Sequence, residues 1–251
     1  MNYAGIVFDK DGTLLDFNRT WLPIYRHAAS EFVPGDAALA LELLSCHGFD
    51  PERERFRGGS LLAAGNNREI AAAWAEQLRQ PERVDDFDRR LRDIFRVQGA
   101  LQATPVDRLT TTLRRLRANG LRLGVATADS YEGILNTLRA FDVLDEFDFL
   151  AGYDSGHGVK PGGGMVRAFC ERMALASEQV IVVGDNRHDI EMGRDARAGL
   201  CVGVLTGTSE RADLEDIADV VLDNIGDLPD YLASATTGNS PGRPHSHQDP
   251  S

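Results

Sequence analysis

The chain is poor in cysteine and contains no long apolar run. Its 251 residues include three cysteines, an odd number scattered through apolar surroundings, which favours buried thiols over disulfides or a thiolate metal site. The first residues are neither basic nor followed by a long apolar stretch, and no apolar run approaches the length of a membrane span. We therefore expect a cytoplasmic protein with no signal peptide and no membrane-spanning segment.

Lysine is nearly absent, and acidic residues outnumber basic ones. Of the 27 basic residues, all but Lys10 and Lys160 are arginines. The formal net charge of −12 argues against nucleic acid or an anionic membrane surface as the main partner. The two lysines either survive by chance or mark positions where a compact ammonium group is needed.

The stretch from Ile6 to Asp16 carries the strongest local signal. An apolar run too short for a helix, Ile6 to Phe8, ends at two carboxylates, Asp9 and Asp11. This pattern predicts a buried strand that delivers charged groups at its C-terminal end, where open α/β sheets place their ligand sites. Two acids this close repel each other unless a cation or a shared proton relieves them. Alone, such a pair is by default a solvated acidic turn, but matching polar groups downstream favour a site.

The rest of the chain divides into a helical part and an alternating part. Residues 17–102 show helical patterns and no strand pattern, whereas helices alternate with apolar strands from Pro105 onward. Such alternation implies parallel βαβ units with right-handed crossovers. We therefore predict an α/β fold with a discontinuous parallel-sheet core, residues 1–16 and 103–233. An all-helical cap, residues 17–102, is inserted above the end of the first strand, and residues 234–251 form a flexible tail.

Polar groups follow three further apolar segments. Asp185 ends the strongest predicted strand and Asp189 stands one helical turn later. Converging carboxylates suit Mg²⁺, although an acid at the position of Asp189 is also typical of a helix N-terminus. Thr127, with nearby backbone N–H groups, could hold an anionic oxygen, and Lys160 could neutralise a phosphoryl group. Taken alone, these two would be an ordinary strand end and a solvated surface lysine.

Together these stretches resemble the four motifs of the haloacid dehalogenase (HAD) superfamily. They are DxDGT at Asp9–Thr13, Thr127 after a strand, Lys160 before a proline, and GDxxxD at Gly184–Asp189. The resemblance spans essentially the whole core and implies a Rossmann-like, HAD-type sheet with the insertion as a C1-type cap. Within this superfamily, the chain resembles the phosphoglycolate phosphatase-like branch. Two departures, three glycines after Pro161 and Asn186 where Ser or Thr is frequent, bear on the substrate rather than on the reaction.

The resemblance implies a phosphatase acting on a small phosphorylated metabolite such as phosphoglycolate. Asp9 is the implied nucleophile, which forms an aspartyl-phosphate. Asp11 is the implied general acid and then general base, and its presence separates phosphate-ester chemistry from dehalogenation. Thr127 and Lys160 are expected to bind the remaining phosphoryl oxygens.

The resemblance also implies Mg²⁺ as the cofactor. Asp9, Asp185 and the backbone carbonyl of Asp11 are the implied metal ligands, and Asp189 is expected mainly to hold metal-bound water. The expected partner is the metabolite alone, with no nucleic acid and no membrane, for a monomer or homodimer. A β-phosphoglucomutase-like phosphomutase is the enzymatic alternative. An inactive phosphate-binding relative or a phospho-acceptor signalling module is the non-enzymatic one, although the complete motif set and the helical lid argue against both.

The loop Arg57-Gly58-Gly59-Ser60 interrupts the helical insertion. Two adjacent glycines permit a tight backbone excursion that helical residues could not follow. Caps of the C1 type typically aim such a loop at the leaving group, so we expect Arg57 to bind a carboxylate or a hydroxyl-rich substrate. The alternative is an exposed turn with a solvated arginine. Trp21 is a lesser candidate for the cleft and otherwise belongs to the core of the cap.

Overall fold

A computed structural model describes residues 3–236. Six strands form one sheet in which every pair is parallel, in the order β5-β4-β1-β6-β7-β8. The strands are β1 (Gly5–Phe8), β4 (Arg122–Ala126), β5 (Phe149–Ala151), β6 (Val180–Gly184), β7 (Leu200–Val204) and β8 (Val220–Leu222). The α/β fold with a parallel sheet is thereby confirmed.

The register brings the ends of the central strands to one level. Phe8, the last residue of β1, pairs with Val125 of β4 on one side and with Val183 of β6 on the other. Because parallel strands all point the same way, the residues after them emerge at a single edge. The segments that begin at Asp9, Thr127 and Asp185 therefore start side by side.

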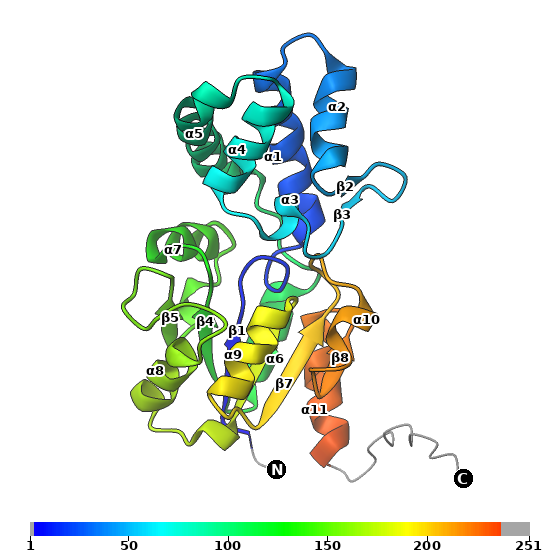
Figure 1. Ribbon diagram of the computed structural model, residues 1–251. Helices are drawn as coiled ribbons and strands as arrows, with labels where there is room; N and C mark the ends of the chain where they lie inside the picture. Colours follow the sequence, from blue (N-terminus) through cyan, green and yellow to red (C-terminus); the bar gives the residue numbers. More distant parts are fainter. Residues whose placement is uncertain (1–2, 237–251) are drawn as a thin grey trace, which may run out of the picture.

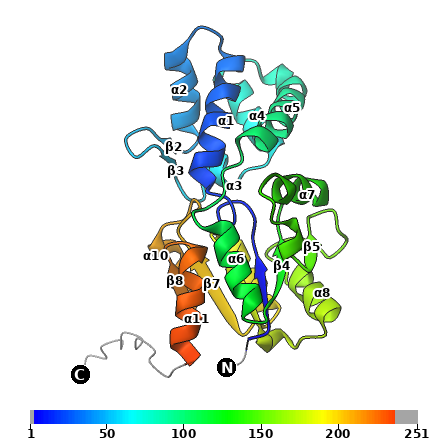
Figure 2. The same cartoon turned by 180° about the vertical axis from the view of Figure 1, so that it is seen from behind.

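Helices cover both faces of the sheet (Figures 1 and 2). Along β1, Ile6 and Phe8 face one hydrophobic cluster and Val7 faces another, as the period of two along a strand requires. The first cluster includes residues of α6 (Leu109–Ala118), α7 (Tyr131–Ala140) and α11 (Leu228–Thr236). The opposite face is covered by α8 (Gly164–Met173), α9 (Arg187–Asp195) and α10 (Arg211–Leu214).

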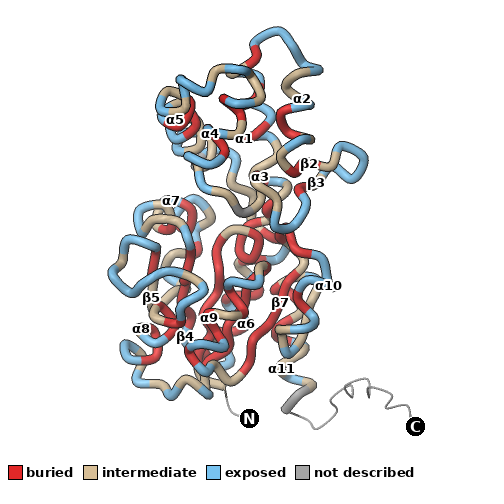
Figure 3. Tube along the Cα trace, viewed as in Figure 1, coloured by how far each residue is buried: buried red, intermediate tan, exposed pale blue. Residues whose placement is uncertain are grey.

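The inserted segment lies above the carboxyl edge of the sheet (Figure 1). Its helices are α1 (Phe17–Phe32), α2 (Ala37–Cys46), α3 (Leu61–Ala64), α4 (Asn67–Gln77) and α5 (Val84–Gln102). They enclose a hydrophobic cluster of their own around Trp74 and Phe87, so buried segments appear in both parts of the molecule (Figure 3). The two connecting segments are joined by the Asp16 N–H, which donates to the carbonyl of Thr104 over 3.0 Å.

Two details differ from the sequence-based expectation. The inserted segment is not purely helical, because β2 (Phe49–Asp50) and β3 (Arg55–Phe56) form a short antiparallel pair. Both phenylalanines are fully buried, and strands of two residues are too short to show an alternating pattern. At the other end, α11 runs to Thr236, past the expected start of the tail at residue 234. The rest of that tail, residues 237–251, lies outside the described residues.

Single-turn 3₁₀ helices complete the described structure, at Pro81–Arg83, Leu144–Glu146, Ser177–Gln179 and Ile225–Asp227. Within residues 3–236, none of the helices combines the length and the apolar character that crossing a membrane requires.

Candidate active site

A cavity of about 1270 Å³ separates the carboxyl edge of the sheet from the inserted helices. Asp9, Asp11, Thr127 and Lys160 all line it, as do both aspartates that follow β6. The structure therefore brings the residues of the four predicted motifs together, although they are as far apart in sequence as positions 9 and 189. Both lysines of the chain, Lys10 and Lys160, lie in this cavity, and their side chains are 5% and 7% exposed.

Three buried carboxylates gather around the ammonium group of Lys160. Oxygens of Asp9, Asp185 and Asp189 lie within 4.8 Å of one another. Lys160 Nζ lies 2.5 Å from Asp9 Oδ1 and 2.5 Å from Asp189 Oδ1. A single ammonium group thus contacts two of three neighbouring carboxylates, and these side chains have little exposure to solvent.

Burial and mutual repulsion shift the pKa values of these carboxyl groups. Burial raises the pKa of Asp9 to about 7, and Asp189 adds to this effect while Lys160 opposes it. Burial and the charges of Asp189 and Asp9 also raise the pKa of Asp185 well above its ordinary value. A further cation would relieve this repulsion, since opposite charge favours the carboxylate form. An all-oxygen donor set of this kind fits Mg²⁺.

Asp185 is held between two glycines. A Cβ atom at Gly12 would lie 2.5 Å from the Asp185 carboxyl carbon, and one at Gly207 would lie 1.7 Å from Asp185 Oδ2. Gly12 also has a φ of +88°, a conformation that side chains rarely adopt, so the turn after Asp11 requires glycine twice over. The Thr208 N–H donates to Asp185 Oδ2 over 3.2 Å and fixes the carboxylate from a third side.

Asp189 fits both interpretations given to it from the sequence. Its Oδ2 accepts a hydrogen bond from the Asn186 N–H over 3.0 Å, which closes the capping box at the start of α9. Its Oδ1 contacts Lys160 in the carboxylate group. The cap of α9 therefore also fixes this carboxylate in the cavity.

Thr127 directly follows strand β4 and is buried. Its N–H donates to the carbonyl of Ala151, and its Oγ1 accepts from the Asp129 N–H over 3.1 Å. The hydroxyl proton is therefore free to donate to an anionic oxygen in the cavity.

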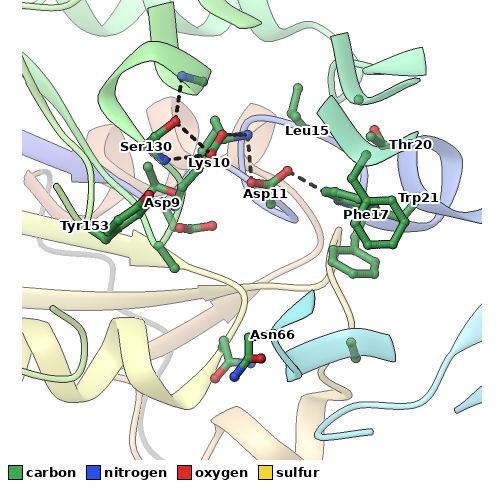
Figure 4. A pocket seen from close by; sticks show the side chains of 18 of the residues that line it. Asp9, Lys10, Asp11, Leu15, Phe17, Thr20, Trp21, Asn66, Ser130 and Tyr153 are labelled. Carbon is green, nitrogen blue, oxygen red and sulfur yellow. Dashed lines mark hydrogen bonds and ion pairs between the residues drawn. The ribbon is translucent and has the colours of Figure 1, made fainter. Parts of the chain in front are cut away.

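Asp11 is contacted from two directions (Figure 4). Lys10 Nζ lies 2.8 Å from Asp11 Oδ2 and 3.0 Å from Asp129 Oδ2. Trp21, on the inserted helix α1, donates its indole N–H to Asp11 Oδ1 over 3.4 Å. Burial alone would lower the pKa of Lys10, but the two carboxylates raise it above its ordinary value, so the ammonium form persists.

The structure corrects the expectation for Arg57. This arginine is not among the described residues that line the cavity. It is exposed, and its Nη2 donates to the carbonyl of Ser45 over 3.0 Å. Ser45 lies in the last turn of α2, where carbonyls have no partner within the helix. Arg57 therefore satisfies a helix end, while Gly58 in the same loop approaches Thr208 of the core.

Other cationic residues of the inserted segment do line the cavity. They are Arg68 at the start of α4 and Arg92 and Arg96 on α5. Their guanidinium groups are exposed and each forms an ion pair within the inserted segment, with Asp85, Asp88 and Asp93 respectively. The sequence could have indicated that the two arginines on α5 face the same side. Together with Phe95 and Gly99, Arg92 and Arg96 follow helical spacing, and all four line the cavity.

Comparisons with known proteins agree with this geometry. A family model described as haloacid dehalogenase-like hydrolase matches residues 3–197. The chain is 30% identical to a phosphoglycolate phosphatase of Escherichia coli (strain K12), covering 89% of this chain and 90% of the relative. It is 26% identical to pyrophosphatase PpaX of Listeria welshimeri, covering 89% and 93%. A solved structure from Thermotoga maritima, assigned as a β-phosphoglucomutase, has a TM-score of 0.70 at 20% identity, covering 92% and 99%.

Proposed function

Because the chain belongs to the haloacid dehalogenase-like hydrolases, we propose that it is a Mg²⁺-dependent phosphatase of a small phosphomonoester. The observation that carries the proposal is the buried group of Asp9, Asp185, Asp189 and Lys160, with Asp11 beside it in the same cavity. Preorganised charges of this kind supply most of what phosphoryl transfer requires, namely positioning and electrostatic stabilisation.

In the first half of the proposed reaction, a carboxylate oxygen of Asp9 attacks phosphorus as the bond to the leaving oxygen breaks. Asp11 donates a proton to that leaving oxygen, so an alcohol departs and an aspartyl-phosphate remains. In the second half, Asp11 takes a proton from water as the water oxygen bonds to phosphorus. Inorganic phosphate leaves, and the Asp9 carboxylate is restored.

The surrounding residues bind and orient the phosphoryl group. Lys160 contacts Asp9 directly and places a positive charge beside the nucleophile, and the hydroxyl of Thr127 can donate to a phosphoryl oxygen. Asp9, Asp185 and the backbone carbonyl of Asp11 would hold Mg²⁺, with Asp189 nearby, and the charge of that ion offsets the charge of the phosphoryl oxygens. The inserted helices limit the access of bulk water.

The substrate class follows from the relatives only as a proposal. A phosphoglycolate phosphatase and a pyrophosphatase are both similar over most of the chain, so we propose phosphoglycolate or a similar small anionic phosphate. The mutase alternative rests on similarity of fold alone, and no contact among the described residues that line the cavity favours it. The cytoplasmic location, and a monomer or homodimer without nucleic acid or membrane partners, remain predictions.

The test is phosphate release from a panel that includes 2-phosphoglycolate, pyrophosphate and β-glucose 1-phosphate, with Mg²⁺ and with a chelator. We expect Mg²⁺-dependent release that disappears in Asp9→Asn, and acid quenching should trap a labelled phosphoenzyme in the parent protein. Conversion of β-glucose 1-phosphate to glucose 6-phosphate would show that the protein is a phosphomutase rather than a phosphatase. Turnover that persists in Asp9→Asn would contradict the nucleophile assignment.

A further inference from the structure

Asp11 is held between the two parts of the molecule. Its Oδ2 contacts Lys10, which belongs to the sheet core, and its Oδ1 accepts from the indole N–H of Trp21, which belongs to the inserted segment. Each oxygen keeps a second lone pair, so the carboxyl group can still exchange a proton with a substrate or with water. The dashed contacts in Figure 4 connect these residues into one chain.

The core end of this chain is fixed. Lys10 is buried and also contacts Asp129, which lies just beyond β4. Asp129 Oδ1 in turn accepts a hydrogen bond from the Ser130 N–H over 2.7 Å, immediately before α7. Lys10 therefore ties the loop after β1 to the loop after β4.

The other end is fixed by packing within the inserted segment. The ring of Trp21 lies against three aromatic rings, those of Phe17, Tyr25 and Phe95, with centroid separations of 6.1, 5.9 and 5.5 Å. Because Phe95 belongs to α5, the direction of the indole N–H depends on the packing of α1 against α5. Any movement of the inserted segment relative to the sheet would change the Trp21–Asp11 distance.

We propose that Trp21 and Lys10 are positioning residues that hold the Asp11 carboxyl group in one orientation, so that its proton transfers depend on the position of the inserted segment. The proposal rests on the proposed function, in which Asp11 is the general acid and base. Neither residue takes part in bond formation. A misplacement of about 1 Å at a reacting group can cost on the order of a hundredfold in rate. Because the Trp21–Asp11 hydrogen bond limits such a misplacement, its loss has a measurable effect on the rate even though the bond is long.

The kinetic test compares Trp21→Phe with the parent on two substrates of similar shape, phenyl phosphate and p-nitrophenyl phosphate. The nitrophenolate leaves without a proton, whereas phenolate needs one. We expect kcat/KM for phenyl phosphate to fall about tenfold or more. For p-nitrophenyl phosphate, kcat/KM should change less than about twofold, while kcat falls and a burst of nitrophenolate appears, because water attack still needs Asp11.

The second tryptophan provides a matched control. Trp74 is fully buried in the inserted segment, and its Nε1 has no hydrogen-bond partner among the described residues. Trp74→Phe removes an indole N–H from the same part of the molecule without touching Asp11, so the ratio of the two kcat/KM values should stay at that of the parent. Equal losses on both substrates in Trp21→Phe would overturn the proposal, because they would indicate damage to the fold of the inserted segment. In the Asp11→Ala background, Trp21→Phe should have no further effect.

A measurement that does not need turnover separates this proposal from the proposed function. The chain has two tryptophans, so a ¹⁵N-labelled protein gives two indole N–H resonances, and Trp21→Phe assigns them. We expect Asp11→Ala, and also Lys10→Met, to shift the Trp21 indole resonance and leave that of Trp74 in place. An unmoved Trp21 resonance in Asp11→Ala would overturn the positioning role even if the enzyme is active. Absence of phosphatase activity together with a shifted resonance would instead defeat the proposed function alone.

Discussion

The two walls of the cavity are built on different physical principles. On the sheet side, five charged or polar residues are buried, with exposed fractions between 1% and 6%: Asp9, Lys10, Thr127, Asp185 and Asp189. On the inserted side, the three arginine side chains are between 61% and 74% exposed. Charges in a water-poor region act strongly and resist reorientation, whereas exposed charges are screened and mobile. From this comparison we propose that the sheet side carries out the chemistry and that the inserted side selects the substrate.

The cause of the difference lies in the main chain. On the sheet side, residues are placed by parallel strands whose backbone hydrogen bonds fix each strand end relative to the next. On the inserted side, they are placed by helices whose chain connections to the core are two segments, near Asp16 and Thr104. A wall of the first kind is preorganised, and a wall of the second kind can adapt to a leaving group.

The largest effect is expected at Asp9. Asp9→Asn keeps the shape of the side chain but removes the nucleophile, so Mg²⁺-dependent phosphate release should fall by at least about 10⁴-fold. Thermal unfolding should shift upward or stay unchanged, because burial and neighbouring acids oppose the charge of Asp9 in the folded protein. A marked fall in the unfolding temperature would mean that the carboxylate group serves the fold rather than the reaction.

Lys160 is the next most sensitive position on the sheet side. Lys160→Met leaves Asp9 and Asp189 without their buried cation, and losing one preorganised charge typically costs on the order of 10²–10³ in kcat. Lys160→Arg should restore little, because a planar guanidinium cannot replace a compact ammonium between two carboxylates. Steady-state kinetics on p-nitrophenyl phosphate measures both. Full activity of Lys160→Arg would contradict the requirement for a compact ammonium group between the two carboxylates.

The sequence was informative on the sheet side for the same physical reason. Short apolar runs that end in Asp9, Thr127 or Asp185 identify strands and their carboxyl ends, and parallel strands bring those ends together. The only two lysines also proved to lie in the cavity. What could not be predicted was how Lys10 divides its contacts between Asp11 and Asp129, because this depends on the packing of two loops.

On the inserted side, the sequence predicted helices but not their inward-facing residues. Arg57 stands in a loop, and the direction of its side chain was decided by a free carbonyl at Ser45, which only the folded structure reveals. The sequence pattern did not predict the pair β2–β3, because its two-residue strands depend on the burial of Phe49 and Phe56. By contrast, Arg92 and Arg96 follow a helical period that could have indicated a shared face.

A prediction of intermediate size concerns selectivity on the inserted side. Arg92→Ala should lower kcat/KM for a substrate with a second anionic group, such as 2-phosphoglycolate. The loss should correspond to about 1–2 kcal/mol of transition-state stabilisation, the scale of a hydrogen bond to a charged group. Turnover of p-nitrophenyl phosphate should hardly change. Parallel measurements of kcat/KM on the two substrates check this.

Two arginines serve as controls for that measurement. Arg89 lies on the same helix but pairs with Asp86 and is not among the described residues lining the cavity, and Arg57 lies in the loop over α2. Arg89→Ala and Arg57→Ala should leave selectivity unchanged. Equal selectivity losses in all three variants would point to a general charge effect rather than to contact with the substrate.

The smallest effect is expected on the free energy of unfolding, at two ion-paired aspartates that are not among the described residues lining the cavity. In the core, Asp148 accepts from the Leu123 N–H and from Arg117 and Arg122 over 2.9 to 3.0 Å. Burial would raise its pKa, but these donors lower it below the ordinary value. In the inserted segment, Asp85 pairs with Arg68, and both side chains are well exposed.

Asp148→Asn should therefore lower the free energy of unfolding at neutral pH by about 1–2 kcal/mol, whereas Asp85→Asn should change it by less than about 0.5 kcal/mol. Since the pKa of Asp148 is lower in the folded state, its carboxylate stabilises the fold above the ordinary pKa of about 3.9 and loses this effect as the pH falls through the folded value. Urea unfolding at pH 7 and in the acid range measures both variants. Activity should be unchanged, because Asp148 lies beside Leu123, at the opposite end of β4 from Thr127. A destabilisation by Asp148→Asn that keeps its size in acid would show that packing, not charge, holds this end of the sheet.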